Sequence, residues 1–130
     1  MDRTTTVLDM YTYPELSWST LDLSGFAVEA SDGGIGAVDD TTHEVGSGFI
    51  IVDTGPWIFG KKVMLPAGVI SRIDENDRRI WVNLTKDQIQ NAPKFDESRH
   101  NDSVYRDEVG SYYVMNRPVG PDYGKDDRGF

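Results

Sequence analysis

GFIIVDTGPWIFGKKVMLP, residues 48–66, joins two strand-like runs through a turn that carries large aromatic side chains. Phe49 to Thr54 is the most apolar run in the chain, and it is apolar on both alternating faces, which is typical of a central strand. Gly55 and Pro56 end this run, because proline lacks the N–H group that a sheet requires. Lys62 to Leu65 follows as a second apolar run. The stretch therefore predicts two strands of a β-sheet.

The sequence on both sides of this stretch continues as short apolar runs separated by turn residues. The expected strands are 26–30, 35–39, 49–54, 62–65, 69–74 and 79–84, and Ser-Asp-Gly-Gly at 31–34 predicts a hairpin turn. Six short strands at close spacing favour a small barrel or sandwich. We predict a mostly β fold, a small six-stranded antiparallel β-barrel, because closure would remove the exposed sheet edges.

Two helices are expected after the strands. Thr85-Lys-Asp-Gln88 has the spacing of a capping box, which predicts a short helix that ends near Asn91, before Pro93. A possible second helix spans 102–113, where one stripe would contain Tyr105, Val109 and either Tyr112 or Tyr113. Gly110 lowers the helical propensity of that segment.

The length of 130 residues fits one compact domain with extensions. We expect an N-terminal arm at 1–25, the β-barrel at 26–94, a C-terminal helical extension at 95–116 and a flexible, Pro- and Gly-rich tail at 117–130. The chain has no cysteine, which excludes disulfides, thiolate zinc sites and cysteine nucleophiles. It also has no long apolar segment and no signal-peptide pattern, so we expect no membrane insertion and a cytoplasmic location.

The formal net charge of −9 lies entirely on the first half of the chain. Residues 1–60 contain ten acidic residues and one basic residue, whereas residues 61–130 contain 12 of each. Such an acidic surface disfavours nucleic-acid binding. The basic residues are concentrated at 61–62, 72 and 78–79. They could form a solvated strand face, bind single-stranded nucleic acid together with nearby aromatics, or pair with the acidic half of another copy.

No catalytic motif is present, and we expect neither enzymatic activity nor a cofactor. Asp39, Asp40 and Asp53 lie on or next to expected neighbouring strands, and converging carboxylates could bind a hard cation or perform acid–base chemistry. The favoured interpretation is structural: Asp40 and the Asp53-Thr54-Gly55 segment are expected to form hydrogen bonds within turns. His43 and His100 are expected at the surface, because both lie in polar stretches.

Several segments together resemble the PRC-barrel family. They are Gly36-Ala-Val-Asp-Asp40, Phe49-Ile-Ile-Val-Asp-Thr-Gly55, Trp57-Ile-Phe-Gly-Lys-Lys-Val-Met-Leu-Pro66, Ile73-Asp74 and Val82-Asn-Leu-Thr-Lys-Asp-Gln-Ile-Gln-Asn-Ala-Pro93, which fall within 26–93. The family includes the cytoplasmic domain of the photosynthetic reaction centre H subunit and the C-terminal domain of the bacterial ribosome maturation factor. The chain looks most like its free-standing bacterial members. The resemblance implies a small all-β barrel that binds other macromolecules and performs no chemistry.

Aromatic residues supply the candidate interaction sites. Trp57 and Phe59 lie in the turn between two expected strands, where they would either contact a partner or close one end of the barrel. Trp81 lies on the last strand, opposite in face to its apolar neighbours. Further candidates are Tyr11, Tyr13 and Trp18 of the arm, which would pack on the domain or on a second subunit.

These observations favour a non-enzymatic protein-interaction or assembly module that self-associates, as a homodimer, and docks a protein partner of unknown identity. One alternative is an RNA- or ribosome-associated maturation factor, which the family resemblance suggests but the acidic charge disfavours. A second alternative is a metal-binding protein that uses the aspartate cluster.

Overall fold

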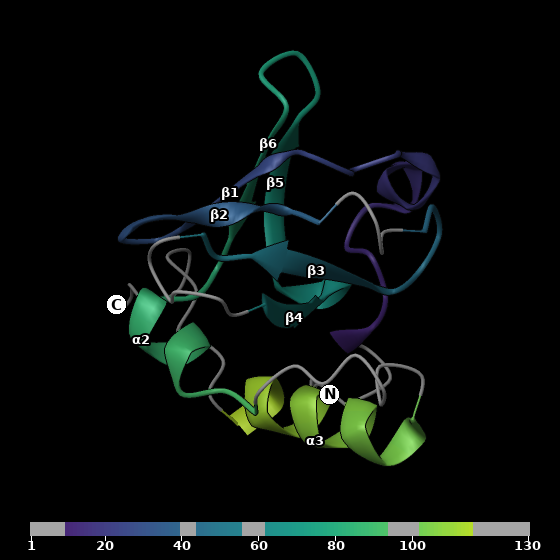
Figure 1. The fold of residues 1–130 in the computed structure, drawn as a ribbon. Coiled ribbons are helices and arrows are strands. Elements are labelled where there is room, and N and C mark those ends of the chain that lie inside the picture. Colours follow the sequence, from purple (N-terminus) through teal and green to yellow (C-terminus); the bar gives the residue numbers. More distant parts are fainter. Residues whose placement is uncertain (1–9, 40–43, 56–61, 94–101, 116–130) are drawn as a thin grey trace, which may run out of the picture.

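The computed structural model describes residues 10–39, 44–55, 62–93 and 102–115. In this part of the chain the structure is mostly β, as predicted (Figure 1). The elements in order are η1 Leu16–Thr20, β1 Ala27–Ala30, β2 Gly33–Val38, β3 Phe49–Asp53, β4 Lys62–Pro66, η2 Ala67–Val69, β5 Ile70–Asp74, β6 Arg79–Val82, α2 Lys86–Gln90 and α3 Ser103–Met115. All six expected strands are present, and each lies within two residues of its predicted bounds.

The strands form one curled sheet in the order β4-β3-β2-β1-β6-β5. Four of the five pairings are antiparallel, but β1 and β6 are parallel, with Ala27 opposite Arg79 and Glu29 opposite Trp81. The sheet also remains open, because β4 and β5 are its two edge strands. The predictions of a purely antiparallel sheet and of a closed barrel were therefore wrong: the sheet is mixed and forms a half-barrel.

The path of the chain between β4 and β5 explains both differences. Only the three residues of η2 separate these strands, so β5 continues in the direction of β4 after a corner instead of folding back along it. The following hairpin then returns β6 in the direction of β1. Alternating apolar residues predict where a strand lies, but they do not fix the direction of its neighbour.

The hydrophobic core follows the alternation within the strands. Phe49 to Val52 are all buried, as expected for a strand covered on both faces, and the pattern on β6 buries Ile80 and Val82. Fully buried aliphatic residues of this kind each contribute about 1.5–3 kcal/mol of hydrophobic stabilisation relative to an exposed position. Strand positions such as these also favour the β-branched Val and Ile found there.

Helix α2 begins with the predicted capping box. The Thr85 hydroxyl accepts a hydrogen bond from Gln88 N at 3.2 Å, and the Gln88 side chain accepts one from Thr85 N at 2.9 Å. The carboxylate of Asp32, in the β1–β2 turn, accepts a further bond from Lys86 N at 2.9 Å. These bonds satisfy N–H groups that the first turn of a helix leaves unpaired, and they join α2 to the sheet.

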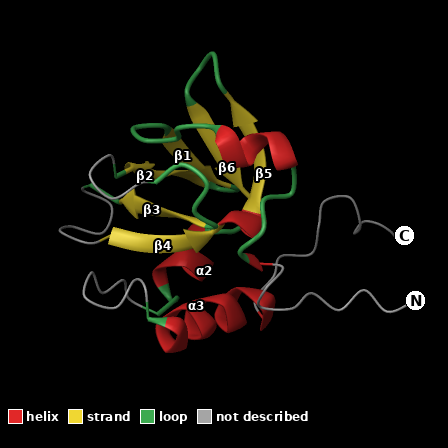
Figure 2. Cartoon of the chain, turned by 90° about the vertical axis from the view of Figure 1, so that its right-hand side faces the viewer, coloured by secondary structure: helices red, strands yellow, loops and turns green. Residues whose placement is uncertain are grey.

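Helix α3 packs against the edge strand β4, and both views place it below that strand (Figures 1 and 2). Tyr105, Val109 and Tyr113 are buried along one stripe, four residues apart, whereas Tyr112 is only half-buried. The Tyr112 hydroxyl donates to the Gln88 carbonyl at 2.6 Å, which ties α3 to α2. The second expected helix is therefore present, with Tyr113 in the buried stripe.

The N-terminal segment is packed into the same core. Met10 and Leu23 are buried, and the chain near Tyr11 passes directly over Gly48. A Cβ atom on Gly48 would lie 2.2 Å from the Tyr11 carbonyl oxygen, so this approach requires glycine. Residues 10–23 therefore help to cover β3 from outside.

Candidate interaction surface

The structure separates the predicted interaction residues into three groups. Trp57 and Phe59 lie outside the described residues, as does Asp40 among the predicted turn residues. Tyr11, Tyr13 and Trp18 are half-buried and pack against the hydrophobic core. Trp81 lies on the outer face of the sheet, away from the core side of β6.

Tyr11 of the N-terminal segment links α3 to the sheet. The Tyr11 hydroxyl donates to the Arg106 carbonyl at 2.6 Å, and the Arg106 guanidinium lies 4.7 Å from the Tyr11 ring centroid. The same guanidinium lies 5.1 Å from the ring centroid of Phe49 on β3. Burial raises the pKa of Tyr11 to about 12 and also raises the pKa of Tyr13. These contacts give the N-terminal aromatics an internal packing role.

Trp81 projects from the half of the sheet that α3 does not cover. Its neighbours Ile80 and Val82 are buried on the core side, so alternation turns the Trp81 side chain outward. In the sheet register it lies between Glu29 on β1 and Arg72 on β5. The Arg72 guanidinium stacks over the indole at 4.3 Å from the ring centroid, a cation–π contact.

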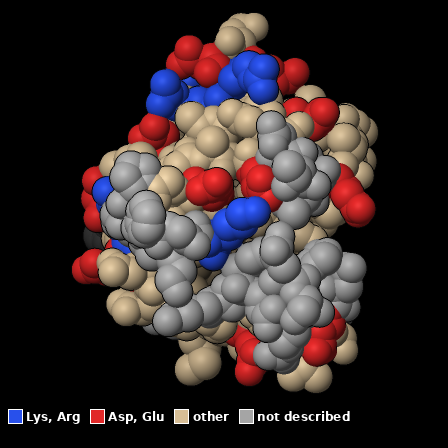
Figure 3. All heavy atoms as spheres, viewed as in Figure 1, with Lys and Arg blue, Asp and Glu red and all other residues tan. Residues whose placement is uncertain are grey.

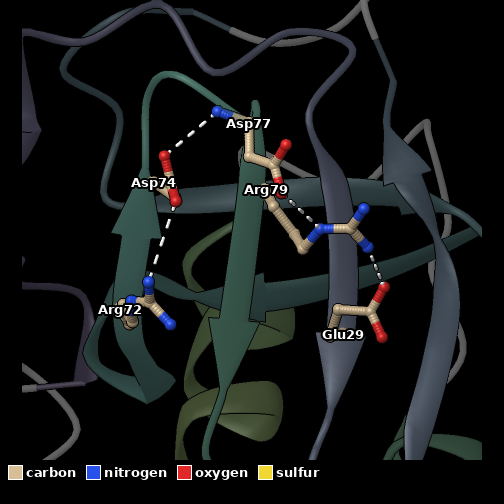
Figure 4. Close-up of polar contacts among 5 residues, drawn as sticks. All are labelled: Glu29, Arg72, Asp74, Asp77 and Arg79. Carbon is tan, nitrogen blue, oxygen red and sulfur yellow. Dashed lines mark hydrogen bonds and ion pairs between the residues drawn. The ribbon is translucent and has the colours of Figure 1, made fainter.

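The charged residues on this face form a connected set, drawn in Figure 4 without Trp81, in which the Asp77 backbone N–H donates to Asp74 Oδ1 at 3.0 Å. Arg79 Nη1 contacts Glu29 Oε2 at 2.6 Å, and Arg79 Nε lies 3.5 Å from Asp77 Oδ2. On the neighbouring strand, Arg72 Nη2 lies 3.7 Å from Asp74 Oδ2. We refer to Trp81 and these charged residues as the outer surface, defined as Glu29, Arg72, Asp74, Asp77, Arg79 and Trp81.

Basic residues that the sequence left available for nucleic acid or another copy form ion pairs within the chain. Two acidic residues from the first half of the sequence pair with basic residues from the second half. Glu29 pairs with Arg79, and Asp39 pairs with Lys62 at 3.2 Å. Figure 3 accordingly shows basic atoms bordered by acidic atoms at the β5–β6 end. The Arg79–Glu29 pair is partly exposed, and such pairs contribute about 0–1 kcal/mol. The outer surface therefore presents balanced charge around an aromatic residue, which differs from a continuous phosphate-binding patch.

Two of the three aspartates that could have formed a cation site, Asp39 and Asp53, lie in the described residues and have separate roles. Asp53 Oδ1 accepts a hydrogen bond from Gly55 N at 3.0 Å, which closes a turn at the end of β3. Thr54, between them, is buried. Asp39 is also buried, with 9% exposure, and faces Lys62. Within residues 10–39, 44–55, 62–93 and 102–115, no group of three or more His, Asp or Glu side chains could hold a metal ion.

Comparison with known proteins adds no relative: no family model matches the chain, and no curated protein matches it significantly. The described helices include none that is both long and apolar enough to cross a bilayer. The geometry of the outer surface is therefore the main guide to function.

Sequence reasoning identified Trp81 but missed its acidic neighbour on β1. The alternation with Ile80 and Val82 was sufficient to turn Trp81 outward. Glu29 is 50 positions from Arg79 and meets it only because β1 and β6 are parallel neighbours. No local signal in the sequence marks that pairing.

Proposed function

We propose that the protein is a non-enzymatic interaction and assembly module of the PRC-barrel type, which acts in the cytoplasm. In this proposal it forms a homodimer and docks a protein partner through the outer surface. The observation that carries the proposal is Trp81, a half-buried indole on the outward-facing side of β6, stacked with Arg72 at 4.3 Å from the ring centroid.

The composition of this surface supports a binding role. Tryptophan and arginine are enriched among the residues that dominate binding energy at protein interfaces. Here Trp81 and Arg72 are adjacent and already stacked. Because the stacking restricts both side chains before binding, they lose less conformational entropy when a partner binds. The surrounding ion pairs would form a polar rim, which favours correct orientation more than affinity.

The face of the sheet is a better docking element than the β5 edge. The β5–β6 register shifts between Ile70 and Arg72, which produces an irregularity at Ser71, whose hydroxyl donates to the Trp81 carbonyl at 3.2 Å. Irregularities and charged residues on an edge strand oppose the addition of a further strand. A partner would therefore approach Trp81 through side chains.

Size-exclusion chromatography with light scattering tests the self-association part of the proposal. We expect the wild type to form a dimer and Trp81→Ala to shift toward monomer, because the variant loses the central anchor. Leu16→Ala is the matched control, since Leu16 is 86% exposed on η1 and lies outside the outer surface. Trp57→Ala tests separately whether Trp57 contacts a partner, which is one of the two roles that the sequence predicts for it.

A wild type that is monomeric at every concentration would contradict the homodimer. A Trp81→Ala variant that dimerises like the wild type would exclude the outer surface as the dimer contact. Capture of the same protein from a lysate by the wild type and Leu16→Ala, with loss in Trp81→Ala, would support the docking role.

A further inference from the structure

A hollow of about 350 Å³ lies beside the β5–β6 hairpin, apart from the residues that define the outer surface. One wall comes from the segment that leads into β1, and the other comes from the hairpin turn. The lining residues are Leu21, Asp22, Ser24, Phe26, Glu75 and Arg78. Two segments far apart in the sequence thus bring a cation, two carboxylates and two apolar side chains to one place.

Arg78 is held in this hollow by an unusual backbone conformation. Its φ is +53°, a left-handed value that costs a non-glycine residue about 1–2 kcal/mol. Its guanidinium Nη2 donates to the Ser24 carbonyl at 2.9 Å and the group lies 5.3 Å from the Phe26 ring centroid. Gly25 leaves the space for this approach, because a Cβ there would lie 3.1 Å from Arg78 Nη2. The guanidinium is therefore positioned before any ligand arrives.

Part of the charge in the hollow has no partner within it. Arg78 forms no ion pair with any carboxylate among the described residues, although a guanidinium offers five donors. Glu75 makes neither a hydrogen bond nor an ion pair within the same described ranges. The Asp22 carboxylate accepts bonds from the backbone N–H and the hydroxyl of Ser24, which fixes its orientation.

We propose that this hollow binds a small zwitterion of the α-amino-acid class. The ligand carboxylate pairs with the Arg78 guanidinium, whose planar donors match carboxylate geometry. The ligand ammonium pairs with Glu75, with Asp22 adding negative charge, and a short aliphatic side chain lies against Leu21 and Phe26. A simple anion would meet the two carboxylates and a simple cation would meet Arg78, so the charge pattern favours a ligand that carries both charges.

The size of the hollow fits this class of ligand. The volume of about 350 Å³ leaves room for a free amino acid, and the hollow is open to solvent, so the ligand would be only partly enclosed. The proposal is independent of the interaction role proposed for the outer surface, because none of the lining residues belongs to that surface.

Titration of the isotope-labelled full chain with L-leucine, followed by NMR, tests the proposal. We expect saturable shifts at Gly25 and Glu75, with binding weaker by about tenfold or more for N-acetyl-L-leucine, which lacks the ammonium, and for L-leucinamide, which lacks the carboxylate. Arg78→Gln and Glu75→Gln should each weaken L-leucine binding by a similar factor. Lys86→Gln is the control and should bind like the wild type, because Lys86 lies outside both the hollow and the outer surface.

Three results would overturn the proposal: no saturable shift with L-leucine, binding of either blocked analogue as tight as that of L-leucine, or undiminished binding of L-leucine by Arg78→Gln. The melting temperature of each variant is measured in parallel. If Arg78→Gln does not fold, Glu75→Gln and the two analogues still decide the outcome.

Discussion

Replacement of Tyr113 by phenylalanine should stabilise the protein. The Tyr113 side chain on α3 is 0% exposed, and its hydroxyl has no hydrogen-bond partner among the described residues. Burial also raises its pKa, as expected for a phenol removed from water. Tyr113→Phe removes only the hydroxyl and retains the ring, which packs edge-on against Tyr112 at a centroid distance of 5.0 Å.

The expected gain comes from the desolvation of an unsatisfied hydroxyl. Burying such a group without a partner costs about 1–3 kcal/mol, so the free energy of unfolding should rise by about 1 kcal/mol or more in Tyr113→Phe. Tyr11→Phe is the matched control, because its hydroxyl donates to the Arg106 carbonyl at 2.6 Å. That variant should lose about 0.5–1.5 kcal/mol.

Urea unfolding followed by tryptophan fluorescence measures both changes. Tyr113→Phe should raise the midpoint and Tyr11→Phe should lower it, with the same dependence of free energy on denaturant as the wild type. If Tyr113→Phe destabilised the protein as much as Tyr11→Phe, the Tyr113 hydroxyl would have a partner and the reasoning would fail.

Three further predictions concern titration, backbone geometry and ion pairing. The pKa of Tyr11 is raised from 10.0 to about 12 on folding, so its contribution to stability is complete below pH 10 and is lost as the pH rises toward 12; unfolding free energies measured across this range should fall less in Tyr11→Phe than in the wild type. Gly36→Ala should lower the free energy of unfolding by roughly 3 kcal/mol or more, because a Cβ at this φ of +144° would lie 2.0 Å from a backbone oxygen of β3. Gly55 has a φ of +57° and open space around it, so Gly55→Ala should lower the free energy of unfolding by only about 1 kcal/mol. Thermal denaturation measures both changes. A double-mutant cycle on Glu29 and Arg79 should give a coupling of about 0.5–1 kcal/mol that decreases with salt, and a coupling of zero at low salt would remove this ion pair from the account.

The strand positions were predictable because they depend on local sequence. Alternating apolar residues and the turn residues between them marked all six strands, and the Thr85–Gln88 spacing marked the start of α2. The spacing of Tyr105 and Val109 likewise indicated the buried side of α3. In each case the residues that give the signal are within a few positions of one another.

The direction and closure of the sheet depend on the path of the whole chain. The corner at η2 sends β5 onward in the direction of β4, and the parallel β1–β6 pairing follows from it. The same limit applies to the outer surface, since Trp81 could be assigned to the outward face but Glu29 could not be placed beside it. The inward packing of Tyr11 depends on α3, which lies 95 positions away at Arg106.

Fluorine NMR of protein labelled with 5-fluorotryptophan tests the proposed function most directly. The Trp81 resonance, assigned with Trp81→Phe, should shift as the protein is concentrated, because dimerisation through the outer surface changes the environment of this indole. The Trp18 resonance should stay constant, since that side chain already packs against the core. A Trp81 resonance that does not move between dilute and concentrated protein would contradict the proposal that the outer surface mediates self-association.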